Sequence, residues 1–254
     1  MLYNLLFPLA EHYPLFNLFK YLTFRSGAAV MTALLISFIF GPMIIRWLKS
    51  KQAHGQPIRD DGPESHLLTK QGTPTMGGVM ILLAVSVSTI LWANLANPYV
   101  WITLFVTTGY GMIGFVDDYI KLTKRHHAGL SGKMKLLLQF AVAIFAVLWI
   151  QKVASPDQAS HLAFPFIKDF MWDMGWFYVL FAGTVMVGAS NAVNLTDGLD
   201  GLAIVPIMIA AACFGLISYL IGNVVFADYL QVHHLHRLSQ NLLLRMYKHH
   251  FLRN

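Results

Sequence analysis

Charged residues are scarce in this chain. Only 12% of its 254 residues are Asp, Glu, Lys or Arg, and 56% are hydrophobic. Soluble globular chains carry about 25% charged residues, so this composition excludes an ordinary soluble globule. There is one cysteine, Cys213, inside an apolar run, which excludes a disulfide framework. The N-terminus lacks the basic start and small-residue cleavage site of a signal peptide. The sequence therefore predicts an integral membrane protein.

Long apolar segments account for most of the chain. A transmembrane helix needs about 20 mostly apolar residues, and six segments are about that long. They are Phe24–Leu48, Met76–Leu95, Pro98–Val116, Met134–Ile150, Trp176–Val193 and Leu202–Ile221. We therefore predict an all-α fold, a polytopic integral membrane helical bundle with about six transmembrane helices. Residues 1–230 would form one membrane domain, followed by a divergent, basic, His-rich tail over residues 231–254.

Lysine and arginine are concentrated after the first and third apolar segments. The positive-inside rule places such loops in the cytoplasm and the N-terminus outside. The stretch after the fifth segment reaches the cytoplasmic side by alternation. The net charge of +6 has the same explanation, so nucleic acid is not an expected partner. The basic residues are Lys49, Lys51, Arg59 and Lys70 in one loop and Lys121, Lys124, Arg125 and Lys133 in the other.

Two adjacent carboxylates, Asp117 and Asp118, end the third apolar segment. Charged groups are costly at the edge of a membrane, so they need a partner or a function. One interpretation is a helix end that simply becomes hydrated. The other is a metal ligand beside a general base, because neighbouring carboxylates repel unless a cation is present or one of them keeps its proton.

A second polar motif, Asn194 to Gly201, follows the fifth apolar segment. Asn194, Asp197 and Asp200 are spaced three apart and would share a face on a helix. The two glycines in the motif indicate a turn in which the backbone could approach a ligand. Asp200 keeps two open interpretations, a ligand-binding residue and the N-cap of the sixth helix.

Three more polar stretches flank the apolar segments. Lys70 to Gly78 is glycine-rich and opens the second segment, where helix N–H groups and a lysine suit phosphate, although a plain helix start fits too. Asp60 to His66 is typical of a solvated acidic loop. Lys121 to Lys135 is a basic loop that either follows the positive-inside bias or attracts an anionic substrate or lipid headgroup. Together the motifs indicate magnesium-assisted chemistry between a nucleotide diphosphate and a membrane component.

Several of these stretches resemble the signature stretches of the phospho-N-acetylmuramoyl-pentapeptide transferases, within the polyprenyl-phosphate sugar-1-phosphate transferases. The resemblance runs from about Tyr21 to about Tyr229. It implies transfer of phospho-MurNAc-pentapeptide from UDP-MurNAc-pentapeptide to undecaprenyl phosphate. The products would be lipid I and UMP, in the first membrane step of peptidoglycan synthesis. The stretches that carry it are residues 60–66, 70–78, 97–101, 114–118 and 191–201.

The resemblance also implies roles for single residues. Asp117 would be the base for the lipid phosphate, with Asp118 beside it, and Asp118 and Asp197 would bind the Mg²⁺ cofactor. It implies a multi-pass protein of the bacterial cytoplasmic (inner) membrane with its active face in the cytoplasm. A homodimer stays open, as does the choice between direct attack and a covalent intermediate. The implied substrate-binding residues are Lys70, Thr75, Lys133, Asn194 and Asp200.

The chain departs from this family, whose fold has about ten spans of bilayer length. The tail from about Gln231 no longer resembles it, and a third acidic cluster of the family is missing. This motivates the hypothesis of a truncated or frame-shifted copy, which would bind Mg²⁺ and nucleotide weakly and lack activity. The helical spacing of leucines in the tail favours an interfacial basic helix over a zinc site.

Other function classes remain open. One is a related polyprenyl-phosphate N-acetylhexosamine-1-phosphate transferase that uses, for example, UDP-GlcNAc. Another is a non-catalytic membrane protein, such as a transporter that uses the acidic clusters as a cation path. Against a transporter, these carboxylates stand at segment ends and not near the bilayer midplane. A third is an inert remnant that keeps only the fold.

Overall fold

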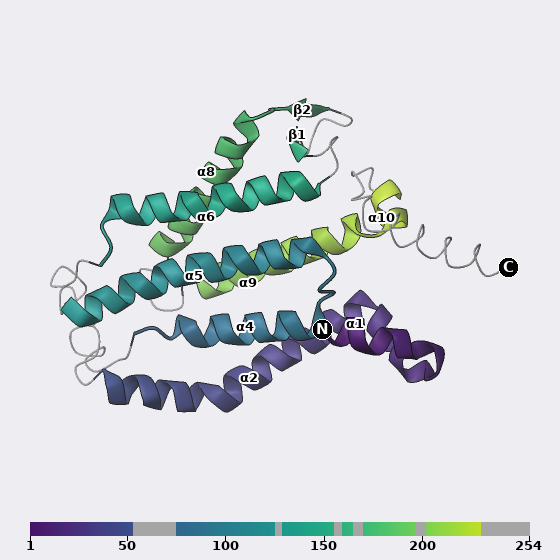
Figure 1. The fold of residues 1–254 in the computed structure, drawn as a ribbon, viewed down its shortest axis with the longest axis horizontal. Coiled ribbons are helices and arrows are strands. Elements are labelled where there is room, and N and C mark those ends of the chain that lie inside the picture. The colour runs from purple at the N-terminus through teal and green to yellow at the C-terminus, as the bar shows by residue number, and fades with distance from the viewer. Residues whose placement is uncertain (53–74, 125–128, 155–158, 165–169, 197–201, 230–254) are drawn as a thin grey trace. The chain divides into compact units, whose positions relative to one another are not determined.

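The computed structural model describes residues 1–52, 75–124, 129–154, 159–164, 170–196 and 202–229 (Figure 1). The regular elements among these residues are helices apart from one short hairpin, so the prediction of an all-α fold is confirmed. The N-terminal elements are α1 (Leu2–Leu6) and the 3₁₀-helices η1 (Phe7–Glu11) and η2 (Pro14–Lys20). Next come α2 (Leu22–Lys51), α4 (Gly78–Trp92), α5 (Pro98–Lys124) and α6 (Gly132–Val153). The remaining elements are β1 (His161–Ala163), β2 (Met171–Asp173), α8 (Phe177–Thr196), α9 (Ile204–Ile221) and α10 (Val224–Tyr229).

Five described helices are long and apolar enough to cross a membrane, namely α2, α5, α6, α8 and α9. The second predicted span forms only the 15-residue helix α4, which is about 22 Å long at 1.5 Å per residue. Met76 has a φ of 74°, so the helix begins only at Gly78, and at its other end Ala93 is extended. At the six predicted segments the described residues thus form five candidate spans and one shorter apolar helix.

The chain divides into two compact units, Met1–Val142 and Ala143–Asn254. In the first unit α2, α4 and α5 lie side by side in chain order (Figure 1). Glycines permit this close packing. A side chain added at Gly41 would lie 3.1 Å from Met80 Sδ, and one at Gly109 would lie 3.0 Å from Val142 Cγ1 in the middle of α6.

The N-terminal elements pack against the end of α4 that lies away from Gly78. The Asn4 side chain donates to Asn94 Oδ1 and accepts the Leu95 N–H, both at 3.1 Å. The ring of Phe19 stacks on Trp92 with centroids 5.8 Å apart. Sequence analysis predicted no element here, because prolines interrupt the segment and no apolar run reaches the length of a span.

The second unit contains a small hairpin that was not predicted from the sequence. Strands β1 and β2 pair antiparallel, with His161 opposite Asp173. Asp173 Oδ1 accepts hydrogen bonds from the Ser160 hydroxyl at 2.6 Å and from the Gly175 N–H at 2.9 Å. Gly175 has a φ of 52°, in the left-handed region that glycine adopts without strain. Helix α10 contacts α9.

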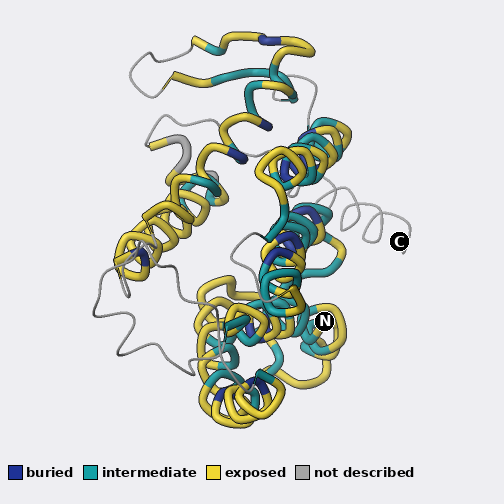
Figure 2. Tube along the Cα trace, turned by 90° about the vertical axis from the view of Figure 1, so that its left-hand side faces the viewer, coloured by how far each residue is buried: buried dark blue, intermediate teal, exposed yellow. Residues whose placement is uncertain are grey.

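Few residues of the long helices are buried, and each of these helices has many exposed residues (Figure 2). Helix α9 has no buried residue, although it is among the most apolar segments of the chain. A soluble protein would bury such a surface, whereas lipid tails are as apolar as leucine. The described helices therefore have the surface of a multi-pass membrane protein.

Candidate functional site

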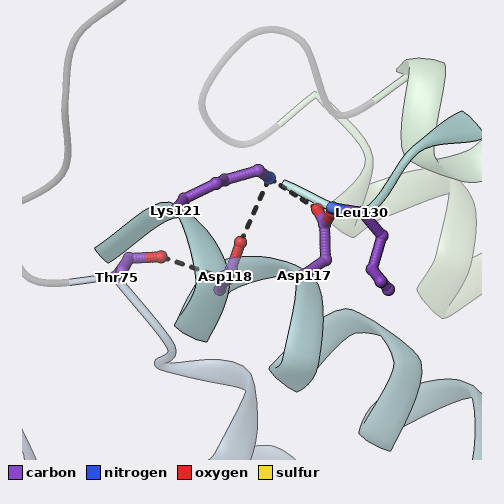
Figure 3. A network of polar contacts seen from close by, with 5 residues as sticks. All are labelled: Thr75, Asp117, Asp118, Lys121 and Leu130. Atoms are coloured by element: carbon purple, nitrogen blue, oxygen red, sulfur yellow. Dashed lines mark hydrogen bonds and ion pairs between the residues drawn. The ribbon is translucent and has the colours of Figure 1, made fainter. Parts of the chain in front are cut away.

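The two carboxylates lie inside helix α5 and not at its end. The predicted third span ended at Val116, but α5 continues to Lys124. Lys121 stabilises the continuation, because its Nζ lies 2.6 Å from Asp117 Oδ2 and 3.4 Å from Asp118 Oδ1 (Figure 3). Such pairs, three and four residues apart, support a helix. The predicted basic loop from Lys121 to Lys135 is therefore wrong at both ends, since those lysines belong to α5 and α6.

Asp117 is largely enclosed, with 9% of the residue exposed. Its Oδ2 faces Lys121, and its Oδ1 accepts the Leu130 backbone N–H at 2.8 Å. Leu130 belongs to the connection that leads into α6, so this connection lies against the carboxylate (Figure 3). An enclosed, fully hydrogen-bonded carboxylate is not the hydrated helix end of the simpler interpretation.

Asp118 connects α5 to the stretch that precedes α4. The Thr75 hydroxyl donates to Asp118 Oδ2 at 3.1 Å (Figure 3). The Thr75 backbone is held by Gln52, the residue that follows α2. Thr75 N–H donates to Gln52 Oε1 at 2.9 Å, and Gln52 Nε2 donates to the Thr75 carbonyl at 3.3 Å. The end of α2, the stretch before α4 and the C-terminal part of α5 therefore meet at one place.

Gln52 and Lys121 were missed as members of this cluster. Gln52 carries no sequence signal, because its contact with Thr75 spans 23 residues and arises only from packing. Lys121 does carry a sequence signal, since its spacing of four and three residues from Asp117 and Asp118 fits ion pairs on a helix. That signal was overlooked because the helix was expected to end before it.

The structure brings together three of the eight predicted site residues, Thr75, Asp117 and Asp118. Lys133 is exposed in the first turn of α6. Asn194 is exposed in the last turn of α8, in the second compact unit. Lys70, Asp197 and Asp200 lie outside the described residues, as do the acidic stretch 60–66 and the tail 231–254.

The second polar motif is described only in part. Helix α8 ends at Thr196 with Asn194 in its last turn, and Asp197 and Asp200 lie outside the described residues, so the shared helix face stays a prediction. Helix α9 begins at Ile204 with Ala203 at its N-cap, so Asp200 does not cap it. The ligand-binding interpretation of Asp200 remains a prediction.

The cluster offers oxygen donors that suit a hard cation. Among the described residues no group of three or more His, Cys, Asp or Glu side chains could hold a metal ion. Mg²⁺, however, is commonly held by one or two protein carboxylates together with water and substrate phosphates. Asp118 is the more accessible donor, because its side chain is 31% exposed and that of Asp117 only 12%.

Comparison with known proteins identifies the family. The sequence model of glycosyl transferase family 4 matches residues 100–235, more than half of the chain. The chain belongs to glycosyl transferase family 4. The match includes α5 with Asp117 and Asp118, and Asn194 at the end of α8. The chain also matches signature 1 of the phospho-N-acetylmuramoyl-pentapeptide transferases at residues 70–82, which include Thr75.

Two relatives of this family 4 chain carry the name phospho-N-acetylmuramoyl-pentapeptide-transferase. The protein of Granulibacter bethesdensis is 59% identical over 232 residues, which make up 91% of this chain and 64% of the relative. The protein of Maricaulis maris is 55% identical over 239 residues, 92% of this chain and 65% of the relative. The resemblance found in the sequence is thereby confirmed. The chain spans a little less than two thirds of the length of these relatives.

Proposed function

We propose that this chain transfers phospho-MurNAc-pentapeptide from UDP-MurNAc-pentapeptide to undecaprenyl phosphate, giving lipid I and UMP in peptidoglycan synthesis. One observation carries the proposal. Thr75, inside the signature match, donates a hydrogen bond to Asp118, beside the enclosed Asp117. Two parts of the sequence that carry the resemblance, 43 residues apart, thus meet in one polar cluster.

In the proposed reaction an oxygen of the lipid phosphate bonds to the β-phosphorus of the donor. The bond from that phosphorus to the bridging oxygen breaks, and UMP leaves with the bridging oxygen. Asp117 would accept the proton of the lipid phosphate. Its Oδ2 now faces Lys121, so this lysine must move aside, and its positive charge would then be available to the phosphates.

Mg²⁺ is the proposed cofactor, held by Asp118 and Asp197. When bound, the ion would neutralise charge on the diphosphate. The donor set fits, because carboxylate oxygens are the ligands that Mg²⁺ prefers. For the substrates we propose Lys70, Thr75, Lys133, Asn194 and Asp200 as binding residues, since lysines and amide or hydroxyl groups pair with phosphate and nucleotide oxygens.

We propose that the site faces the cytoplasm from the bacterial inner membrane. Basic residues occupy the last turns of both α2 and α5, the same end of the first compact unit as Thr75 and Asp118 (Figure 1). The positive-inside rule assigns such an end to the cytoplasm. A homodimer is part of the proposal by family resemblance alone.

The test is UMP release by the purified chain with Mg²⁺, undecaprenyl phosphate and one of two donors. We expect release from UDP-MurNAc-pentapeptide, little from UDP-GlcNAc, and a loss of at least about a hundredfold in Asp117→Asn, as for removal of a catalytic base. Preference for UDP-GlcNAc would assign the chain to a related hexosamine-1-phosphate transferase. No release from either donor would refute transfer by this chain and agree with the inactivity expected from the sequence.

A further inference from the structure

Gly129 lies in unusually close contact with Asp117. A Cβ atom added at Gly129 would clash with Asp117 Oδ1. It would also lie 2.8 Å from Asp117 Cγ and 2.9 Å from the backbone carbonyl oxygen of Asp117. Carbon atoms in proteins do not approach polar atoms this closely without a shift of one partner. Only the absence of a side chain at residue 129 allows the connection before α6 to lie against the carboxylate.

The requirement at Gly129 is for space and not for a special backbone conformation. In the described chain the residues with positive φ are Met76 and Gly175, so Gly129 does not use the left-handed region that often explains a glycine. Nor could rotation of the Asp117 side chain relieve the clash, since the Asp117 carbonyl belongs to the backbone of α5. A side chain at residue 129 must therefore push Gly129 and Leu130 away from α5.

The close approach fixes the orientation of the carboxylate. Leu130, the next residue, donates its N–H to Asp117 Oδ1 at 2.8 Å, and this bond exists only while the connection stays close. With Oδ1 held, Oδ2 points to Lys121 at 2.6 Å. Oδ2 is then the oxygen that can exchange its lysine partner for a proton.

We propose that Gly129 is a positioning residue for Asp117. Its missing side chain lets the Leu130 N–H hold Oδ1, so that Oδ2 is presented to the acceptor phosphate in one orientation. The proposal rests on the proposed function, in which Asp117 is the base. It assigns a role to a residue for which the sequence alone predicted none.

The test compares Gly129→Ala with Gly132→Ala. Both replace a glycine by alanine close to the start of α6, but a Cβ at Gly132 meets nothing within 4 Å. For Gly129→Ala we expect kcat of UMP release to fall about tenfold to a hundredfold, as for a small misplacement of a reacting group. The donor KM should stay within about twofold, because Asp117 is the base for the acceptor and not a donor contact. Gly132→Ala should match the wild-type chain.

A second readout does not depend on activity. Carbodiimide coupling to an amine, followed by peptide mass spectrometry, measures the accessibility of Asp117 relative to Asp118 in the same molecule. Gly129→Ala should raise this ratio several-fold and Gly132→Ala should not. An unchanged ratio overturns the proposal, whether or not kcat falls. A wild-type chain that releases no UMP refutes the proposed function, and the labelling ratio still tests whether Gly129 holds the carboxylate.

A third measurement covers the case in which Gly129→Ala cannot be recovered folded. The Leu130 amide of the wild-type chain should exchange its hydrogen slowly, because its N–H is bonded to an enclosed carboxylate. Asp117→Ala removes the acceptor and should make this exchange at least about tenfold faster. Rapid exchange in the wild-type chain would overturn the proposal.

Discussion

Lys121 Nζ lies 2.6 Å from Asp117 Oδ2 and 3.4 Å from Asp118 Oδ1, so one lysine pairs with both carboxylates of α5. It occupies the position where a cation would have to bind the same oxygens. Lysine and a divalent ion would therefore compete for this pair, and removal of the lysine should favour the ion.

The first prediction concerns this competition. Lys121→Met keeps the aliphatic stem and the helix propensity but removes the charge. We expect Mn²⁺, as a probe for Mg²⁺, to bind about fivefold more tightly, which corresponds to a partly exposed ion pair of about 1 kcal/mol. Titration followed by electron paramagnetic resonance measures the affinity. Lys124→Met, an exposed lysine on the same helix end, is the control. Weaker Mn²⁺ binding in Lys121→Met would show that the lysine assembles the site and does not compete for it.

The second prediction concerns the link between the signature match and α5. Thr75→Val removes the hydroxyl that donates to Asp118 and keeps the shape. A hydrogen bond to a charged group contributes about 1.5–3 kcal/mol, so we expect kcat/KM of UMP release to fall about tenfold or more. Thr75→Ser should be intermediate, because it keeps the hydroxyl on a smaller side chain. Equal losses in the two variants would mean that the methyl group matters and the hydrogen bond does not.

A third prediction tests the packing of α4 on α5. A side chain at Gly111 would lie 2.9 Å from Leu82 Cδ2, whereas one at Gly114, a helical turn further on, meets nothing within 4 Å. Overpacking costs about 1–3 kcal/mol, and alanine gains up to about 1 kcal/mol over glycine in a helix. Gly111→Ala should therefore lower the midpoint of thermal unfolding in detergent relative to Gly114→Ala. Equal midpoints would show that Leu82 moves aside freely.

The fourth prediction concerns the hairpin and pH. Hydrogen bonds from the Ser160 hydroxyl and the Gly175 N–H hold the pKa of Asp173 below its ordinary value of 3.8. Because the pKa is lower in the folded state, ionised Asp173 stabilises the hairpin at any pH above its unfolded-state pKa. This contribution is lost as the pH falls through the folded-state pKa. Protection of the amides of residues 171–175 from hydrogen exchange should therefore decrease below about pH 4. Hydrogen exchange, corrected for the intrinsic exchange rate at each pH, measures this protection. In Asp173→Asn the protection should not change over this range, and an acid-dependent loss there would point to another group.

Much of the fold could be predicted because the apolar runs are long. Composition and run length placed α2, α5, α6, α8 and α9, since a segment that must satisfy its backbone in lipid has little choice but a helix. The extension of α5 to Lys124 was missed, because a polar helix end is stabilised by pairs of side chains. The length of the apolar run gives no information about such pairs. The short α4 was overestimated for a related reason, since the backbone at Met76 is not helical although its side chain is apolar.

The candidate site was predicted in part. Asp117, Asp118 and Thr75 were found from residue type and resemblance, and the structure brings them together. The contacts that hold them, from Gln52, Lys121 and the Leu130 backbone N–H, join residues through packing or through a helix that was expected to end earlier. Asp197, Asp200 and Lys70 stay predictions, as they lie outside the described residues.

The shortness of α4 has a consequence for the surrounding bilayer. A helix of 15 residues covers about 22 Å, whereas the hydrocarbon layer is about 30 Å thick. The difference is a hydrophobic mismatch, and uncovered polar backbone at the helix end would be expensive in lipid. Asn4 accepts the Leu95 N–H there, and Phe19 stacks on Trp92. The N-terminal elements therefore cover this end of α4 in place of lipid. Bilayers of different acyl-chain length should thus strain the junction between α4 and these elements before they strain the polar cluster at the opposite end of α4.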